Sequence, residues 1–286
     1  MLAGTPKQTV ARLALADGAV LRGRAFGAAL APGEAARGEV VFNTAMTGYQ
    51  ESLTDPSYSG QILVQTMPLI GNTGVNSEDE ESTRVHVSGL VVHELANRHS
   101  NYRAEGSLGG YLASAGVPGI EGLDTRALTR RIRTHGAIPG AIATDPSIPD
   151  QALVGLAREA PPMQGANLVP RVGCREPRVW DESLGAWRWA AVERREGKSR
   201  SVAVLDCGAK SNILRQLVSR GCRVRMLPHD EPASALEEMV QRGEVHGVLV
   251  SNGPGDPGAV SETISTLRRL MHNRADMPIF GICLGH

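Results

Sequence analysis

The sequence predicts an α/β protein in which an α+β domain comes first and a doubly wound parallel-sheet domain follows. In the first part of the chain, strand-like and helical patterns do not alternate, whereas after residue 200 short apolar runs and helical patterns alternate strictly. The length of 286 residues also fits about two domains. We therefore expect an N-terminal domain over residues 1–195 and a second domain over residues 200–286.

The first domain is expected to begin with a hairpin, because Asp17 and Gly18 form a turn signal between residues 10–15 and 19–25. Further strands are expected at runs rich in Val, Ile and Leu: residues 40–44, 61–66 and 85–95. Asp124 is a suitable N-cap for a helix over Thr125–His135, which Gly136 would end. A second helix is expected over residues 149–160.

The pattern weakens over residues 176–200, and the polar run 193–200 is interpreted as a linker or an exposed loop. Beyond it, strands are expected at residues 201–205, 223–227, 245–251 and 278–282, with helices at 209–220, 233–242 and 260–273. This order predicts a parallel sheet covered by helices on both faces.

Composition excludes several classes of function. The 30 basic and 30 acidic residues balance, which argues against a nucleic-acid partner. No apolar run approaches the ~18 residues of a membrane helix, and residues 1–8 do not resemble a secretory signal. The 4 cysteines form no C-x-x-C pair, so we expect free thiols and a cytoplasmic location. The 8 histidines form no zinc motif, and we expect no metal site.

Residues 281–285, Gly-Ile-Cys-Leu-Gly, are the strongest candidate for chemistry. They follow an expected strand and would open a helix, which is the context of a nucleophile elbow with Cys283 in place of serine. Amides at the start of that helix would favour the thiolate, and the Leu284 N–H would hydrogen-bond an oxyanion. The alternative is a buried structural cysteine at a strand end.

A second candidate segment is residues 251–257, Ser-Asn-Gly-Pro-Gly-Asp-Pro, which directly follows the expected strand ending near Val250. Loops at the carboxyl ends of parallel strands converge on the ligand crevice, so this loop and Cys283 should share one edge of the sheet. Gly253 and Gly255 would present backbone to the substrate, with the Gly253 N–H as a second oxyanion donor. An ordinary turn is the alternative.

Together these two segments resemble the class I glutamine amidotransferases, whose nucleophile motif matches residues 280–286, Phe-Gly-Ile-Cys-Leu-Gly-His. The resemblance implies that Cys283 attacks the side-chain amide of L-glutamine, releases ammonia and forms a glutamyl thioester that water hydrolyses. The fold it implies for the second domain is the class I amidotransferase sheet.

The first half of the chain narrows this resemblance to the family of carbamoyl-phosphate synthase small subunits. The matching segments are residues 38–44, 46–51, 53–58, 70–74, 124–126 and 206–210. By analogy, Ser57 also binds the glutamine. A large-subunit partner would bind ATP and Mg²⁺, receive the ammonia and make carbamoyl phosphate for arginine and pyrimidine synthesis; no cofactor is expected in this chain.

Two departures from the family matter. Cys207 stands where an aromatic residue is common, and we interpret it as a small buried hydrophobe. Family members also continue beyond residue 286 with a His general base and an orienting Glu. The other in-chain histidines are interpreted as surface or satisfied core residues. On this basis the second domain is incomplete, and this chain alone is expected to hydrolyse glutamine negligibly.

Two alternatives remain at this point. In the first, the chain is a catalytically inert binding module of the same complex. In the second, it is an unrelated cysteine hydrolase of the α/β-hydrolase type.

Overall fold

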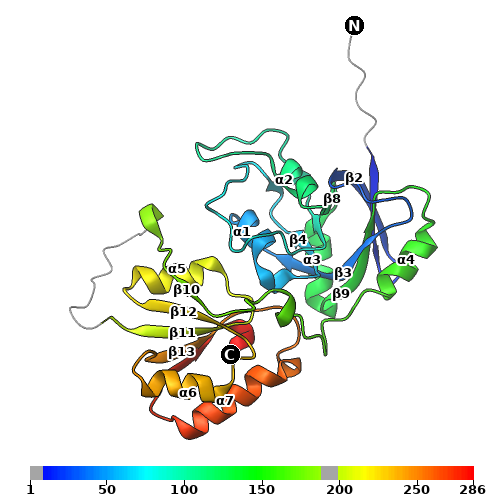
Figure 1. The fold of residues 1–286 in the computed structure, drawn as a ribbon. Coiled ribbons are helices and arrows are strands. Elements are labelled where there is room, and N and C mark those ends of the chain that lie inside the picture. Colours follow the sequence, from blue (N-terminus) through cyan, green and yellow to red (C-terminus); the bar gives the residue numbers. More distant parts are fainter. Residues whose placement is uncertain (1–8, 188–198) are drawn as a thin grey trace. The chain divides into compact units, whose positions relative to one another are not determined.

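The structure, a computed structural model, describes residues 9–187 and 199–286, and the chain divides into two compact units, Met1–Pro162 and Met163–His286 (Figure 1). Residues 1–8 and most of the predicted linker at 193–200 lie outside the described residues. The unit boundary comes earlier in the chain than the predicted boundary at 195–200. The difference arises because long-range pairing, which sequence patterns do not show, joins residues 163–187 to the second unit.

The first unit is built on a closed barrel with the strand order β1-β2-β8-β6-β4-β3-β9. Its strands are β1 (Val10–Leu15), β2 (Val20–Gly27), β3 (Ala36–Asn43), β4 (Ile62–Gln65), β6 (Gly89–Val91), β8 (Pro118–Glu121) and β9 (Ile138–Ala143). The predicted hairpin is confirmed, since β1 and β2 pair antiparallel around Gly18, whose φ is 99°. Leu13, Ile62 and Ile142 fill the barrel interior and are fully buried.

Helices and a small sheet surround the barrel. They are α1 (Tyr49–Thr54), α2 (Leu108–Ser114), α3 (Thr125–His135), α4 (Asp150–Arg158), and the two-stranded sheet of β5 (Leu69–Ile70) and β7 (Glu94–Leu95). The predicted α3 is confirmed, with the Asp124 carboxylate accepting from the Ala127 N–H. The single strand predicted over residues 85–95 is wrong, because the chain leaves the barrel after Val91 and pairs next with β5.

The second unit is an open five-stranded sheet in the order β10-β12-β11-β13-β14. Its elements are β10 (Arg178–Trp180), β11 (Ser201–Asp206), α5 (Ser211–Ser219), β12 (Arg223–Pro228), α6 (Ala233–Gln241), β13 (Gly247–Val250), α7 (Ser261–Asn273) and β14 (Ile279–Gly281). The predicted alternation is confirmed, and the last four strands in the chain run parallel. The stretch 176–200, where the sequence pattern weakens, contains a strand that was not predicted, because β10 pairs antiparallel with β12.

The helices of the second unit cover both faces of its sheet. Leu214 of α5 packs in one cluster with Val204 and Leu249, whereas Leu236 of α6 and Leu270 of α7 pack in another. Figure 1 shows α5 on one side of the strands and α6 with α7 on the other. This two-layer covering leaves the carboxyl ends of the parallel strands as the place where loops meet.

Candidate active site

Three loops of the second unit follow neighbouring parallel strands at their carboxyl ends. In the sheet register, Leu205 of β11 lies beside Val250 of β13, and Val250 lies beside Gly281 of β14. The loops that begin after these strands, at Asp206, Ser251 and Ile282, therefore start at one edge of the sheet. We call them the three edge loops.

Cys283 lies in a strained turn directly after β14. Its φ is 55°, and it is the one non-glycine residue with a positive φ in the described parts of the chain. A left-handed conformation costs a side-chain-bearing residue about 1–3 kcal/mol and is kept where surrounding structure imposes it. The side chain is exposed. A nucleophile elbow has these two properties, a strained backbone and an accessible reactive atom.

Close backbone approach explains both glycines that flank Cys283. A Cβ on Gly281 would lie 2.1 Å from the Gly285 carbonyl oxygen. A Cβ on Gly285 would lie 2.3 Å from the Val250 carbonyl oxygen, because the turn packs onto the end of β13. The Ile282 N–H donates to the same Val250 oxygen at 3.0 Å. Cys283–Gly285 form a 3₁₀ turn at the point where a helix was expected to begin.

At this edge of the sheet, the backbone N–H groups of Gly253, Cys283 and Leu284 have no acceptor among the residues that the structure describes. Gly253 is nevertheless buried. More than about 90% of buried backbone N–H groups are paired in native proteins, so an unpaired one requires an explanation. Binding of a negatively charged oxygen would satisfy it.

Gly253 is buried because its loop packs against the edge loop after β11. A Cβ on Gly253 would lie 2.1 Å from the Cys207 carbonyl oxygen, so no larger residue fits. The fully buried Ser251 hydroxyl joins the same two loops. It accepts from the Cys207 N–H at 2.9 Å and donates to the Asn252 carbonyl oxygen at 2.8 Å.

Asp206 orders the edge loop after β11. Its carboxylate is almost completely buried and accepts from the backbone N–H groups of Cys174, Gly208 and Ala209 at 2.8, 3.0 and 2.8 Å. Sequence reasoning did not assign a role to Asp206 or Ser251. The sequence did contain a signal for them, because each is a polar residue at the carboxyl end of a buried apolar strand.

The four cysteines differ in their fitness for nucleophilic chemistry. Cys207 is fully buried, which confirms its prediction as a small hydrophobe, and burial followed by the nearby Asp206 charge raises its pKa to about 12. The same causes raise the pKa of Cys174 to about 12, and burial raises that of Cys222. Since the thiolate is the nucleophile, these three are poor candidates. Cys283 is the exposed thiol.

Ser57 lies in the first unit, in a 3₁₀ turn over Pro56–Tyr58. The Asp55 carboxylate accepts from the Ser57 N–H at 2.8 Å and caps this turn. Its role toward glutamine stays a prediction, as do those of Gly253, Gly255, Leu284 and Cys283.

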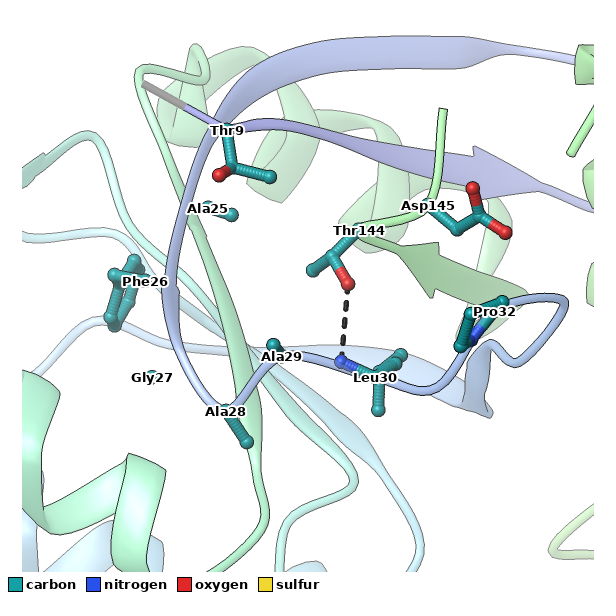
Figure 2. Close-up of a pocket in the computed structure, with 10 residues that line it drawn as sticks. All are labelled: Thr9, Ala25, Phe26, Gly27, Ala28, Ala29, Leu30, Pro32, Thr144 and Asp145. Atoms are coloured by element: carbon teal, nitrogen blue, oxygen red, sulfur yellow. Dashed lines mark hydrogen bonds between the residues drawn. The ribbon is translucent and has the colours of Figure 1, made fainter. Parts of the chain in front are cut away.

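A separate hollow of about 340 Å³ lies in the first unit between the loop after β2 and the end of β9 (Figure 2). Figure 2 shows the Thr144 hydroxyl directed toward Leu30, whose N–H donates to it at 3.2 Å. Small apolar side chains make up most of the lining. Its carboxylate, Asp145, accepts from the Gly33 N–H at 2.8 Å. Its lining residues include no Cys, Ser, His or Lys, so we do not consider it a second active site.

Within residues 9–187 and 199–286, no group of three or more His, Cys, Asp or Glu side chains is placed to hold a metal ion. In the same ranges, no helix is both long enough and apolar enough to cross a bilayer.

Comparison with known families gives two matches. Residues 13–142 match the family described as carbamoyl-phosphate synthase small chain, CPSase domain. Residues 203–286 match the family described as glutamine amidotransferase class-I. The second match contains all three edge loops, and the first contains Ser57.

Curated relatives agree with these matches. The carbamoyl phosphate synthase small chain of Synechococcus sp. is 49% identical over 98% of this chain and 68% of its own length. That of Thermosynechococcus vestitus is 49% identical over 97% and 70%. The chloroplastic small chain of Arabidopsis thaliana is 42% identical over 96% and 61%.

Proposed function

This chain belongs to the family of carbamoyl-phosphate synthase small chains and is a glutamine amidotransferase chain, and we propose that Cys283 is its nucleophile toward L-glutamine. The observation that carries the proposal is the strained turn that exposes this thiol, at the sheet edge where the Gly253 and Leu284 N–H groups are unpaired. Membership of this family leaves no support for an unrelated α/β-hydrolase.

The proposed reaction begins when the Cys283 thiolate forms a C–S bond to the side-chain carbonyl carbon of glutamine. The carbonyl electron pair moves to its oxygen, and the N–H groups of Gly253 and Leu284 stabilise that oxyanion. When the electron pair returns, the C–N bond breaks and the nitrogen leaves with an added proton as ammonia. Water then attacks the thioester, which gives glutamate and the free thiol.

The proton from the thiol must reach the leaving nitrogen through a base. In the described ranges, the Cys283 side chain has no hydrogen-bond partner. We propose that the base and the carboxylate that orients it come from the part of the family's sequence that lies beyond the segment aligned with this chain. Ser57 is proposed as a glutamine ligand, supported by the Asp55-capped turn that fixes its backbone.

We also propose that the ammonia is used by a large chain, which binds ATP and Mg²⁺. The support is the family itself, because a small chain implies a large one. A cytoplasmic or other reducing location is proposed from the four free cysteines.

The test is Cys283→Ala in the complete protein assembled with its large chain. We expect glutamine-dependent ammonia release to fall by at least about 10³-fold, while synthesis from added ammonia continues, because the nucleophile alone is lost. Cys222→Ala is the matched control and should leave both activities unchanged. Glutamine hydrolysis within twofold of wild type in Cys283→Ala would refute the assignment, and no ammonia release from wild type would refute the function.

A further inference from the structure

The connecting segment, residues 163–174, lies in the gap between the two family matches and is covered by neither. It opens the second unit and contains a 3₁₀ turn, Val169–Arg171. Val169 is fully buried in the core that also contains Val250. The segment is therefore anchored to the sheet under the edge loops and is not a free tether.

The first half of the connecting segment holds the loop that contains Gly253. The Asp256 carboxylate accepts from the Gly165 N–H at 2.8 Å and from the Gly258 N–H at 2.9 Å. The Asp256 N–H donates in return to the Ala166 carbonyl oxygen at 2.9 Å. These reciprocal bonds tie the two backbones together.

The approach between these backbones is too close for side chains. Asn167 and Gly255 form an antiparallel bridge. Gly255 has a φ of 89°, and a Cβ on it would lie 2.4 Å from the Ala166 carbonyl oxygen. Gly255 therefore faces the connecting segment, which gives a reason for a glycine at this position that does not involve glutamine.

The second half of the connecting segment holds the neighbouring edge loop. The Cys174 N–H donates to the Asp206 carboxylate at 2.8 Å. A Cβ on Gly173 would lie 2.4 Å from the Asp206 carbonyl oxygen. Because Gly253 itself packs on Cys207, the connecting segment and the two loops form a closed circuit of contacts around the Gly253 N–H.

We propose that residues 163–174 act as a positioning clamp for the oxyanion site and that Asp256 is its principal positioning residue. The clamp fixes the direction of the Gly253 N–H through Asp256 and Gly255 on one side and Asp206 on the other. This inference rests on the proposed function. Preorganised donors lower a barrier only when they already point at the developing charge, so a loosened loop reduces turnover more than substrate binding.

The experiment compares Asp256→Asn with Asp276→Asn in the complete protein assembled with the large chain. Asparagine replaces one carboxylate oxygen by an NH₂ group. That NH₂ group would face the N–H of Gly165 or Gly258, and two donors cannot form a hydrogen bond. We expect kcat for glutamine hydrolysis to fall about tenfold with KM changed less than about threefold. Asp276 precedes β14 at the opposite end of the strands and has a 75% exposed side chain, so its variant should match wild type.

Amide hydrogen exchange supplies a readout that does not depend on activity. The Asp256 N–H bonded to Ala166 should exchange at least about tenfold faster in Asp256→Asn than in wild type, and also in Gly165→Ala, where the φ of 75° strains alanine. Unchanged exchange in both variants, or faster exchange without a fall in kcat, would overturn the clamp. If the wild-type protein releases no ammonia while the two variants still exchange faster than wild type, the proposed function fails and with it the catalytic role of the clamp.

Discussion

The two units differ in whether their main sheet has free edges. Every barrel strand of the first unit has two neighbours, so its backbone hydrogen bonds are satisfied within a closed ring. The sheet of the second unit is open, with β10 and β14 as its outer strands. Closure leaves little free backbone, whereas the open sheet ends in loops that carry an exposed thiol and, at the same edge, unpaired N–H groups. Chemistry is expected where the sheet is open.

A pair of glycine substitutions, one in each unit, tests this division. Gly285→Ala would place a Cβ 2.3 Å from the Val250 carbonyl oxygen and 2.7 Å from its carbonyl carbon, which are backbone atoms that must move. We expect glutamine hydrolysis to fall about 100-fold, since a displacement near 1 Å has this effect on a catalytic geometry.

Gly89→Ala in the barrel is the matched change. Its Cβ would lie 2.7 Å from Ile142 Cδ1, the end of a side chain that can rotate. We expect it to lower the free energy of unfolding by about 1–3 kcal/mol and to leave hydrolysis within twofold of wild type. Steady-state kinetics and urea unfolding measure the two effects. A larger loss of activity in Gly89→Ala than in Gly285→Ala would contradict the assignment of chemistry to the open sheet.

Stability should depend on the closed barrel more than on the open edge. Leu13 is fully buried inside the barrel, whereas Val179 on the outer strand β10 is 76% exposed. Leu13→Ala is expected to cost about 2–5 kcal/mol through lost burial and a cavity, and Val179→Ala less than about 0.5 kcal/mol. Hydrogen exchange resolved by peptide would assign each loss to its unit. Equal costs would show that the outer strand is covered in the protein.

The two units also differ in how far the sequence predicted them. From β11 onward each apolar run is a strand and each periodic stretch a helix, so local patterns were sufficient for that part of the second unit, whereas β10 was missed. In the barrel, β8 and β9 were missed because Pro118-Gly119 and Pro139-Gly140 resemble turns. The structure requires these glycines. A Cβ on Gly119 would lie 2.4 Å from the Phe26 ring, and one on Gly140 2.5 Å from Val40.

The same limit applies to the candidate site. Cys283 and the loop of Gly253 were predicted because each is a short contiguous motif after a strand. The contacts of Asp256 with Gly165 and of Asp206 with Cys174 join residues far apart in the chain, and no local pattern reports them. The residues that would do chemistry were therefore accessible from sequence, whereas those that would hold them in place were not.

Acid should weaken the first unit through one histidine, His86, which lies just before β6. The prediction of satisfied histidines is wrong for His86, whose buried Nδ1 atom has no hydrogen-bond partner among the described residues. The Ser82 hydroxyl donates to the Thr54 carbonyl oxygen at 2.6 Å and lies 2.9 Å from His86 Nε2. The Nε2 atom must then carry the proton, and protonation of Nδ1 would bury an unpaired N–H.

Burial, with a contribution from Arg84, lowers the pKa of His86 to about 4 from its usual 6.5. Between these values the unfolded chain binds more protons than the folded one, so the free energy of unfolding decreases as pH falls through this window. Partial exposure limits the loss to about 1–2 kcal/mol. His86→Gln should flatten the pH dependence of urea unfolding in the first unit, while the exposed His135→Gln should keep the wild-type slope. An unchanged slope in His86→Gln would show that the acid sensitivity of the first unit comes from other groups.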